Sequence, residues 1–283
     1  MSSISAERGS FNIGEVIATG FQTLNRGWIK LISLTVLPWL LAYALVLGGV
    51  SGGSMVAGMS TGPVTVDSAG GATVHWGVFA MIFGLFAVIG ILYVVCQAAL
   101  IYGVVEQLGG RAYSFGGAVS VGLSRVGRMI GIALVLIAAY LCFIAVIMLL
   151  GAIIPPLLFI AVPALFFIAG PMLACAFFVL FPVASVEDHG IIGSFTRSRF
   201  LTKGYRWPIF GLILILFLGM AAINIVVAYV VQAALPTIAA ALANLLIGVW
   251  LSTLFSVIIA VAYFRLRYLK EGVSVDQIAS VFD

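Results

Sequence analysis

The residues with chemically active side chains are few, and one short run holds three of them. Glu187, Asp188 and His189 are consecutive, and carboxylates beside an imidazole are groups that acid–base catalysis and metal binding use. Neighbouring residues on a strand or loop point in different directions, so these three cannot by themselves converge on one ion or substrate atom. We therefore interpret the run as a turn that caps a following helix, with catalysis or metal binding as the alternative.

Three other titratable side chains, Asp67, His75 and Glu106, lie outside this run. Asp67 and His75 belong to a segment rich in Gly and Ser that offers too few further ligands to hold a metal ion. Glu106 lies near the end of a long hydrophobic segment and is expected to be solvated there. The sequence therefore predicts no catalytic residue, no metal site and no cofactor.

The elements that must carry these side chains are hydrophobic. Of 283 residues, 64% are apolar and only 8% are charged, and the mean hydropathy is +1.28. A soluble protein of this length still exposes to water roughly a quarter of the surface of its unfolded chain. With so few charged residues, much of that exposed surface would have to be apolar. The sequence predicts an all-α polytopic membrane protein and excludes a disordered or nucleic-acid-binding chain.

Hydrophobic segments of about 20 residues, the length that crosses a bilayer as a helix, occur six times. Pro155 and Pro156 separate the third from the fourth, which indicates a tight hairpin because proline cannot continue a helix. The six predicted transmembrane helices form three hairpins and cover 31–50, 76–105, 129–151, 157–181, 208–231 and 238–264.

The basic residues all lie on one predicted side of the membrane. The 13 lysines and arginines fall before the first span, between the second and third, between the fourth and fifth, and after the sixth. The opposite loops, 51–75, 152–156 and 232–237, contain none. Because basic residues near span ends are retained in the cytoplasm, both termini are predicted to be cytoplasmic.

A polar but periodic segment precedes each hairpin, and each is expected to form an amphipathic helix at the cytoplasmic membrane surface. Asn12 provides an amino-terminal cap for the first. Gly20 of the first copy matches Gly122 of the second, and Trp28 matches Trp207 of the third. These copies predict a threefold repeat within one integral membrane domain, 1–283, with repeat units 11–105, 113–182 and 190–264 and a cytoplasmic tail, 265–283.

Two sets of residues are candidates for binding or packing. The first is basic and lies beside the predicted amphipathic helices, where it would bind anionic lipid headgroups or simply anchor the inner face of the bundle. This headgroup set is Arg197, Arg199, Lys203, Arg206, Arg26, Arg125 and Arg128. The second consists of small or polar residues inside the spans, which are expected to pack helices or hydrogen-bond between them. This packing set is Gln97, Asn224, Asn244, Gly248, Ser252 and Ser256.

A family resemblance covers most of the chain. The segment 181–207, which begins FPV and ends FTRSRFLTKGYRW, resembles the membrane domain of the glycerophosphoryl diester phosphodiesterase family in its stand-alone bacterial inner-membrane form. The segments 11–27 and 263–272, the latter YFRLRYLKEG, are similar to the same family. Its phosphodiesterase activity belongs to a separate barrel of about 250 residues, for which the six spans leave no room. The resemblance therefore implies a non-enzymatic protein of the bacterial inner membrane, near phospholipid metabolism.

Three functions are open at this point. The favoured one is a scaffold or lipid-associated factor whose surface helices contact lipid headgroups, a protein partner or a second copy of the chain. The alternative is an uncoupled permease for a small or amphipathic molecule, which would need a continuous polar cavity; the central parts of the spans hold no Asp, Glu, Lys, Arg or His for ion coupling. An intramembrane lipid enzyme would need residues from among Glu106, Glu187, Asp188 or His189 to converge in a cleft.

Overall fold

The computed structural model describes residues 11–51, 64–66, 72–74, 76–109, 114–153 and 169–272, together with 163 and 167. These residues are almost entirely helical, as predicted. The exception is a short antiparallel hairpin within the predicted outer loop, in which Val64 pairs with Val74. The elements are α1 (Ile13–Ser51), β1 (Val64–Val66), β2 (Ala72–Val74), α2 (Trp76–Leu108), α3 (Phe115–Ile153), α5 (Gly170–Ala176), α6 (Leu180–Val186), α7 (Gly190–Thr202), α8 (Arg206–Ala234) and α9 (Thr237–Glu271).

Within the described residues, five helices, α1, α2, α3, α8 and α9, are long and apolar enough to cross a membrane. They contain the first, second, third, fifth and sixth predicted spans, which confirms the membrane class. The first part of the fourth predicted span, 157–181, lies largely outside the described residues, as do Pro155 and Pro156. The described part of that region belongs to a shorter apolar stretch, Gly170–Val186, which holds α5 and α6.

The predicted surface helices differ in how they join the spans. The first two are continuous with the following span. In α1 the surface helix and the span are separated only by a break at Gly27, whose φ of −132° and ψ of 27° are not helical. The third is a separate helix, α7, because the chain turns between Thr202 and Arg206. The cap at Asn12 is confirmed, since its Oδ1 accepts hydrogen bonds from the backbone N–H groups of Gly14 and Glu15.

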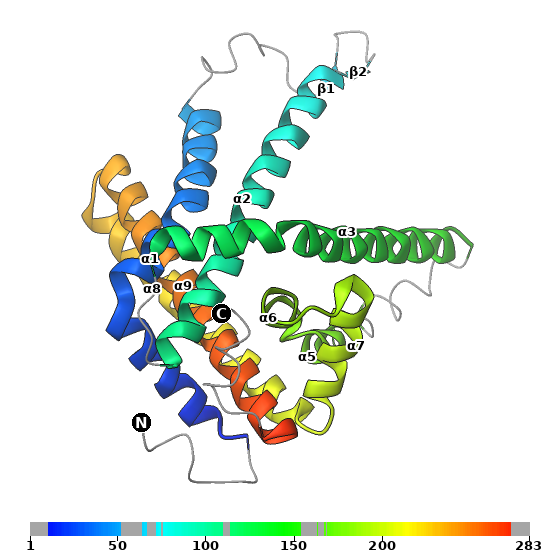
Figure 1. Cartoon of the computed structure of the whole chain (residues 1–283). Helices are drawn as coiled ribbons and strands as arrows, with labels where there is room; N and C mark the ends of the chain where they lie inside the picture. Colours follow the sequence, from blue (N-terminus) through cyan, green and yellow to red (C-terminus); the bar gives the residue numbers. More distant parts are fainter. Residues whose placement is uncertain are drawn as a thin grey trace.

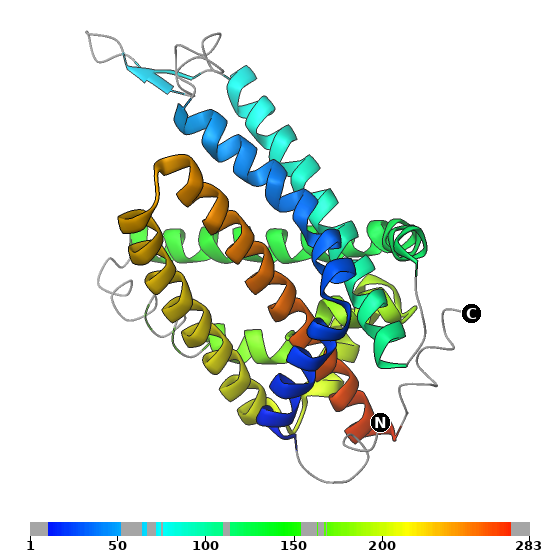
Figure 2. The same ribbon diagram turned by 90° about the vertical axis from the view of Figure 1, so that its left-hand side faces the viewer.

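Helices α1, α2, α8 and α9 pack together, and α3 packs against α2 and extends away from this group (Figures 1 and 2). The first residues of α1 and α8 and the last residues of α2 and α9 lie at one end of this group (Figure 2). The core is apolar and gathers side chains from α1, α2, α6 and α9; among its most buried members are Leu31, Val104, Val183, Ile258 and Leu266. The described core therefore depends on contacts between helices far apart in the sequence.

The contact between α1 and α9 uses part of the predicted packing set. A Cβ atom on Gly248 would lie 3.2 Å from Cζ3 of Trp39, and Nε1 of the same tryptophan donates a hydrogen bond of 2.9 Å to Oγ of Ser252. One helical turn away, the hydroxyls of Thr35 and Thr253 lie 2.7 Å apart. Small and hydroxylated side chains on α9 thus let α1 approach closely.

The rest of the packing set forms local hydrogen bonds. Gln97 bonds Tyr93 one turn earlier in α2. The amides of Asn224 and Asn244 each donate to the carbonyl four residues before them, and Ser256 does the same with its hydroxyl. Among the described residues, these four side chains therefore do not form the expected hydrogen bonds between helices. Each of them bonds within its own helix instead.

Candidate functional site

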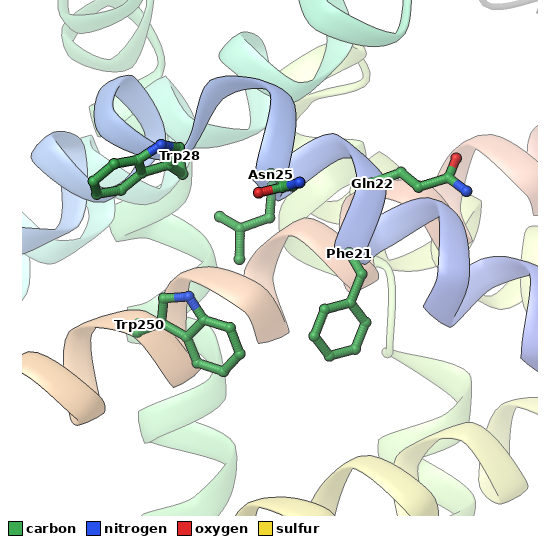
Figure 3. Close-up of a pocket in the computed structure, with 6 residues that line it drawn as sticks. Phe21, Gln22, Asn25, Trp28 and Trp250 are labelled. Carbon is green, nitrogen blue, oxygen red and sulfur yellow. The ribbon is translucent and has the colours of Figure 1, made fainter.

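Two features of the described residues are candidates for a site, and the first is an open pocket between α1 and α9. It lies beside the break at Gly27 and has a volume of about 400 Å³. Aromatic rings from both helices face it (Figure 3). Its lining consists of Phe21, Gln22, Leu24, Asn25, Trp28 and Trp250.

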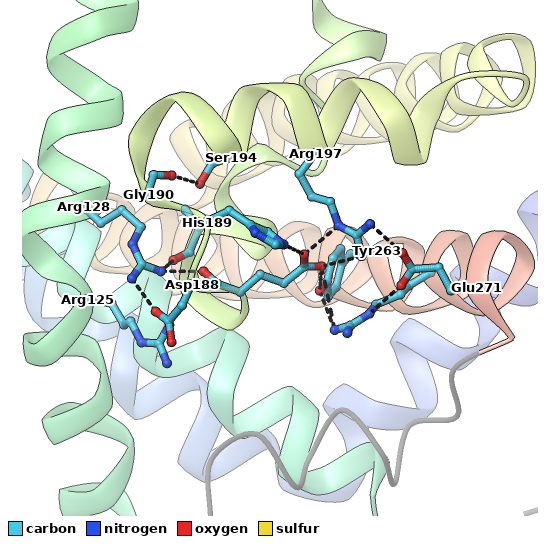
Figure 4. Close-up of polar contacts among 12 residues, drawn as sticks. Arg125, Arg128, Asp188, His189, Gly190, Ser194, Arg197, Tyr263 and Glu271 are labelled. Atoms are coloured by element: carbon cyan, nitrogen blue, oxygen red, sulfur yellow. Dashed lines mark hydrogen bonds and ion pairs between the residues drawn. The ribbon is translucent and has the colours of Figure 1, made fainter.

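The second feature is an ion cluster where α6 meets α7, next to the end of α9 (Figure 4). The chain leaves α6 in an extended conformation at Glu187 and re-enters a helix at Gly190, whose φ of +68° favours glycine. This sharp turn directs the two acidic side chains to different partners, as the adjacency of Glu187 and Asp188 predicts.

Glu187 is the centre of the cluster and is only 7% exposed. Its Oε1 accepts a hydrogen bond of 2.6 Å from the hydroxyl of Tyr263, and its Oε2 accepts one of 2.6 Å from Nε of Arg197. Nε2 of His189 lies 2.8 Å from the same Oε2. Nη1 of Arg267 lies 3.8 Å from Oε1. The carboxylate of Glu187 is therefore surrounded by structural partners and is engaged through both of its oxygens.

A second carboxylate, Glu271, completes an alternating arrangement of charges. Its Oε1 lies 2.5 Å from Nη1 of Arg197, and its Oε2 accepts a hydrogen bond of 3.2 Å from Nε of Arg267. Burial alone lowers the pKa of the Arg197 guanidinium, but its hydrogen bonds to Glu271 and Glu187 outweigh burial and raise that pKa. We call Glu187, His189, Arg197, Tyr263, Arg267 and Glu271 the Glu187 cluster.

Asp188 points the other way, toward α3. Its Oδ1 accepts hydrogen bonds from Arg128 and, at 2.8 Å, from Arg125. The hydrogen bond from Arg128 is the main reason that the pKa of the Asp188 carboxyl lies below its ordinary value. Arg128 also donates to the backbone carbonyls of Ala184 and Glu187, at 3.1 and 2.5 Å. Arg128 thus provides hydrogen-bond donors to backbone carbonyls at the carboxyl end of α6, where a cation also interacts favourably with the helix dipole.

These contacts correct two expectations from the sequence. The acidic run does not cap α7 through a side chain, since no side-chain hydrogen bond caps that helix at His189; its carboxylates pair with arginines instead. Glu106 is 6% exposed, so it is buried and not solvated. Among the described residues, no group of three or more His, Cys, Asp and Glu side chains is placed to hold a metal ion. Asp67 and His75 lie outside them.

The structure divides the predicted headgroup set. Arg125, Arg128 and Arg197 are engaged by carboxylates, so much of their charge is neutralised within the protein. By contrast, Arg199 and Lys203 are exposed at the end of α7, and no ion pair joins either to another residue of the described ranges. Arg26 is exposed on α1, and Arg206 is partly buried at the start of α8.

Sequence reasoning missed the partners that α9 contributes to the Glu187 cluster. Arg267 and Glu271 carried a usable signal, because opposite charges four residues apart meet on one helix face. Tyr263 carried none, since a tyrosine inside a hydrophobic segment is indistinguishable from a packing residue until the fold brings Glu187 to it. Comparison with family models, with curated proteins and with solved structures finds no match for this chain.

Proposed function

We propose that this chain is a non-enzymatic membrane protein that binds anionic phospholipid headgroups through the exposed end of α7. We call Arg199 and Lys203 the α7 basic surface. The proposal depends on which basic side chains are paired with acidic ones and which are not. Carboxylates engage Arg125, Arg128 and Arg197, whereas these two cations are exposed and have no acidic partner among the residues that the structure describes.

Exposed aromatic side chains beside the α7 basic surface support a place at the membrane boundary. Trp207 is 84% exposed at the start of α8, and Phe200 is 50% exposed on α7. Tryptophan is enriched where the bilayer meets water, because one part of its ring system is apolar and the N–H group is polar. Clustered basic side chains at such a boundary attract anionic lipids by about 1 kcal/mol each.

The wider plan of the proposal is the six-span, threefold arrangement with both termini in the cytoplasm of a bacterium. Two structural details support the repeat. Ser114 caps α3 through a hydrogen bond from the N–H of Gly117, at the position that matches Asn12 in α1. The matched residues Gly20 and Gly122 each lie against another helix, α9 and α2 respectively. The resemblance to the phosphodiesterase family's membrane domain supports the inner membrane and a role near phospholipid metabolism.

A scaffold or lipid-associated factor fits these observations better than an enzyme or a permease. Glu187 and Asp188, the strongest candidates for acid–base chemistry, are engaged by arginines. The side chains buried between α1, α2 and α9 are mostly apolar. A protein partner or a second copy of the chain would be compatible with the same surface. Lipid is preferred because exposed cations and exposed aromatic rings occur together there.

Native mass spectrometry of the purified protein with co-extracted lipids tests the proposal. The variant Arg199→Gln/Lys203→Gln should retain anionic phospholipid about thirtyfold less well, since two cations contribute about 2 kcal/mol. The variant Arg199→Lys/Lys203→Arg keeps both charges and should retain lipid as the wild type does. Equal retention by the wild type and the glutamine variant would refute the headgroup role.

A further inference from the structure

The pocket beside Gly27 exists because α1 bends around α9. A Cβ atom on Gly20 would lie 2.6 Å from Cγ1 of Ile258, and farther along α1 the hydroxyl of Thr35 meets that of Thr253. As a helix at 1.5 Å per residue, α1 is about 22 Å long between these two contacts, whereas α9 is about 8 Å long between its own two. A straight α1 could not reach both contacts, so the helix bends at Gly27. The pocket lies between α1 and α9 at this bend.

The pocket walls are aromatic, and the rings are exposed. Phe21, Trp28 and Trp250 are 45%, 54% and 38% exposed, and the rings of Phe21 and Trp250 lie 6.2 Å apart in a tilted arrangement. In Figure 3 the two tryptophans and Phe21 surround one space. Large exposed rings that gather around a cavity offer an apolar ligand more contact area than single exposed side chains do.

The polar groups of the pocket come from a single face of α1. Gln22 and Asn25 are exposed, and neither amide forms a hydrogen bond within the part of the chain that the structure describes. Arg26 is exposed one helical turn after Gln22, so it lies on the same side of α1. The pocket therefore combines an apolar wall with free hydrogen-bond donors and an adjacent cation.

We infer that this pocket binds one phospholipid molecule at the membrane boundary. The amides and Arg26 would donate hydrogen bonds to the phosphate and ester oxygens of the headgroup region. The three rings would contact the upper part of an acyl chain. Its volume of about 400 Å³ lies within the range of small-molecule sites, roughly 300–1,000 Å³. The remainder of the chains continues along the exposed helices. This site is separate from the α7 basic surface and accepts a zwitterionic lipid, because any phospholipid carries the phosphate.

Fluorescence quenching by a brominated lipid tests this inference. The full chain, in detergent, is titrated with a phosphatidylcholine whose acyl chain carries bromine near the glycerol, and tryptophan emission is recorded. We expect part of the emission to be quenched saturably in the wild type. In Gln22→Leu/Asn25→Leu, half-saturation should need about tenfold more lipid, because two hydrogen bonds of about 0.5–1.5 kcal/mol are lost.

Controls keep the result interpretable. Gln22 and Asn25 are exposed, so the double variant should unfold at the wild-type temperature; if it does not fold, each single variant replaces it. Trp28→Phe removes one reporter and should reduce the saturable part of the quenching. Arg199→Gln/Lys203→Gln should leave the titration unchanged, which separates this inference from the proposed headgroup role.

Two outcomes would overturn the inference. Quenching that rises linearly with lipid and is identical in the double variant would mean that the rings meet only bulk lipid. Absence of saturable quenching, together with self-association of the wild type that Gln22→Leu/Asn25→Leu abolishes, would mean that a second copy of the chain occupies the pocket.

Discussion

Arg197 and Arg199 are two residues apart on α7, yet they have opposite environments. Arg197 contacts Glu187 and Glu271 and leaves 19% of its side chain exposed. Arg199 is exposed and forms no ion pair with the described residues. Two residues correspond to about 200° around a helix, so the pair occupies opposite faces. A count of basic residues treats them as equal, whereas the fold gives one a structural role and leaves the other available to a ligand.

The buried face of α7 explains this division. Ser194, Ser198, Leu201 and Thr202 are buried, and the hydroxyls of Ser198 and Thr202 both donate to the backbone carbonyl of Ala176. These contacts fix the rotation of α7 against the segment before it. Fixed in this way, the helix presents Arg197 to the Glu187 cluster and Arg199 to its surroundings.

The largest expected effect concerns the centre of the cluster. Glu187→Gln removes the charge that balances Arg197 and Arg267, and breaking a buried ion pair in this way costs about 3–5 kcal/mol. The free energy of unfolding, measured in mixed micelles of increasing SDS content, should fall by that amount. Asp188→Asn is the matched control because its side chain is 65% exposed. Equal losses in the two variants would contradict the buried cluster.

A smaller effect is expected from Tyr263→Phe. The change removes the hydroxyl that donates to Glu187 and accepts a hydrogen bond of 3.2 Å from Arg267. Leaving buried polar groups without a partner costs about 1–3 kcal/mol. The same unfolding assay measures this loss, with Tyr268→Phe as the control on the less buried side of α9. A loss below that of the control would show that the hydroxyl does not support Glu187.

The smallest effect concerns Asp188, whose pKa in the folded chain is lowered by the hydrogen bond from Arg128. A lowered pKa stabilises the fold above the unfolded-state pKa of about 3.9. That stabilisation disappears as the pH falls through the folded value. For this exposed ion pair it should stay under about 1 kcal/mol. The stability difference between the wild type and Asp188→Asn, measured from pH 7 to pH 3, should therefore shrink below about pH 4. A constant difference would argue against the ion pairs with Arg125 and Arg128.

The sequence predicted the features that depend on local composition. Five of the predicted spans lie within long apolar helices, and Asn12 caps α1 as expected. Hydrophobic length and capping chemistry act within a few residues, so a sequence pattern suffices to predict them. A boundary between the surface helix and the first span was expected, but its form, a break at Gly27 within one continuous element, was not.

The candidate site was predictable only in part, because its partners are distant in the sequence. The acidic run was singled out, and its side chains do diverge, but pairing Glu187 with Tyr263 requires α9 to pack beside the turn that follows α6. The same limit explains why Glu106 was expected to be solvated. The sequence indicates that Glu106 lies near a helix end. Its burial, however, depends on the helices packed around it, which the sequence does not indicate.

One comparison tests most directly whether the cations of α7 have two separate roles. Arg197→Gln and Arg199→Gln are each measured for the free energy of unfolding and for anionic phospholipid retained by the folded protein. Arg197→Gln should lose about 3 kcal/mol of stability and keep its lipid. Arg199→Gln should stay within about 0.5 kcal/mol of wild-type stability and retain lipid about fivefold less well. Parallel losses of stability and lipid in both variants would contradict the division.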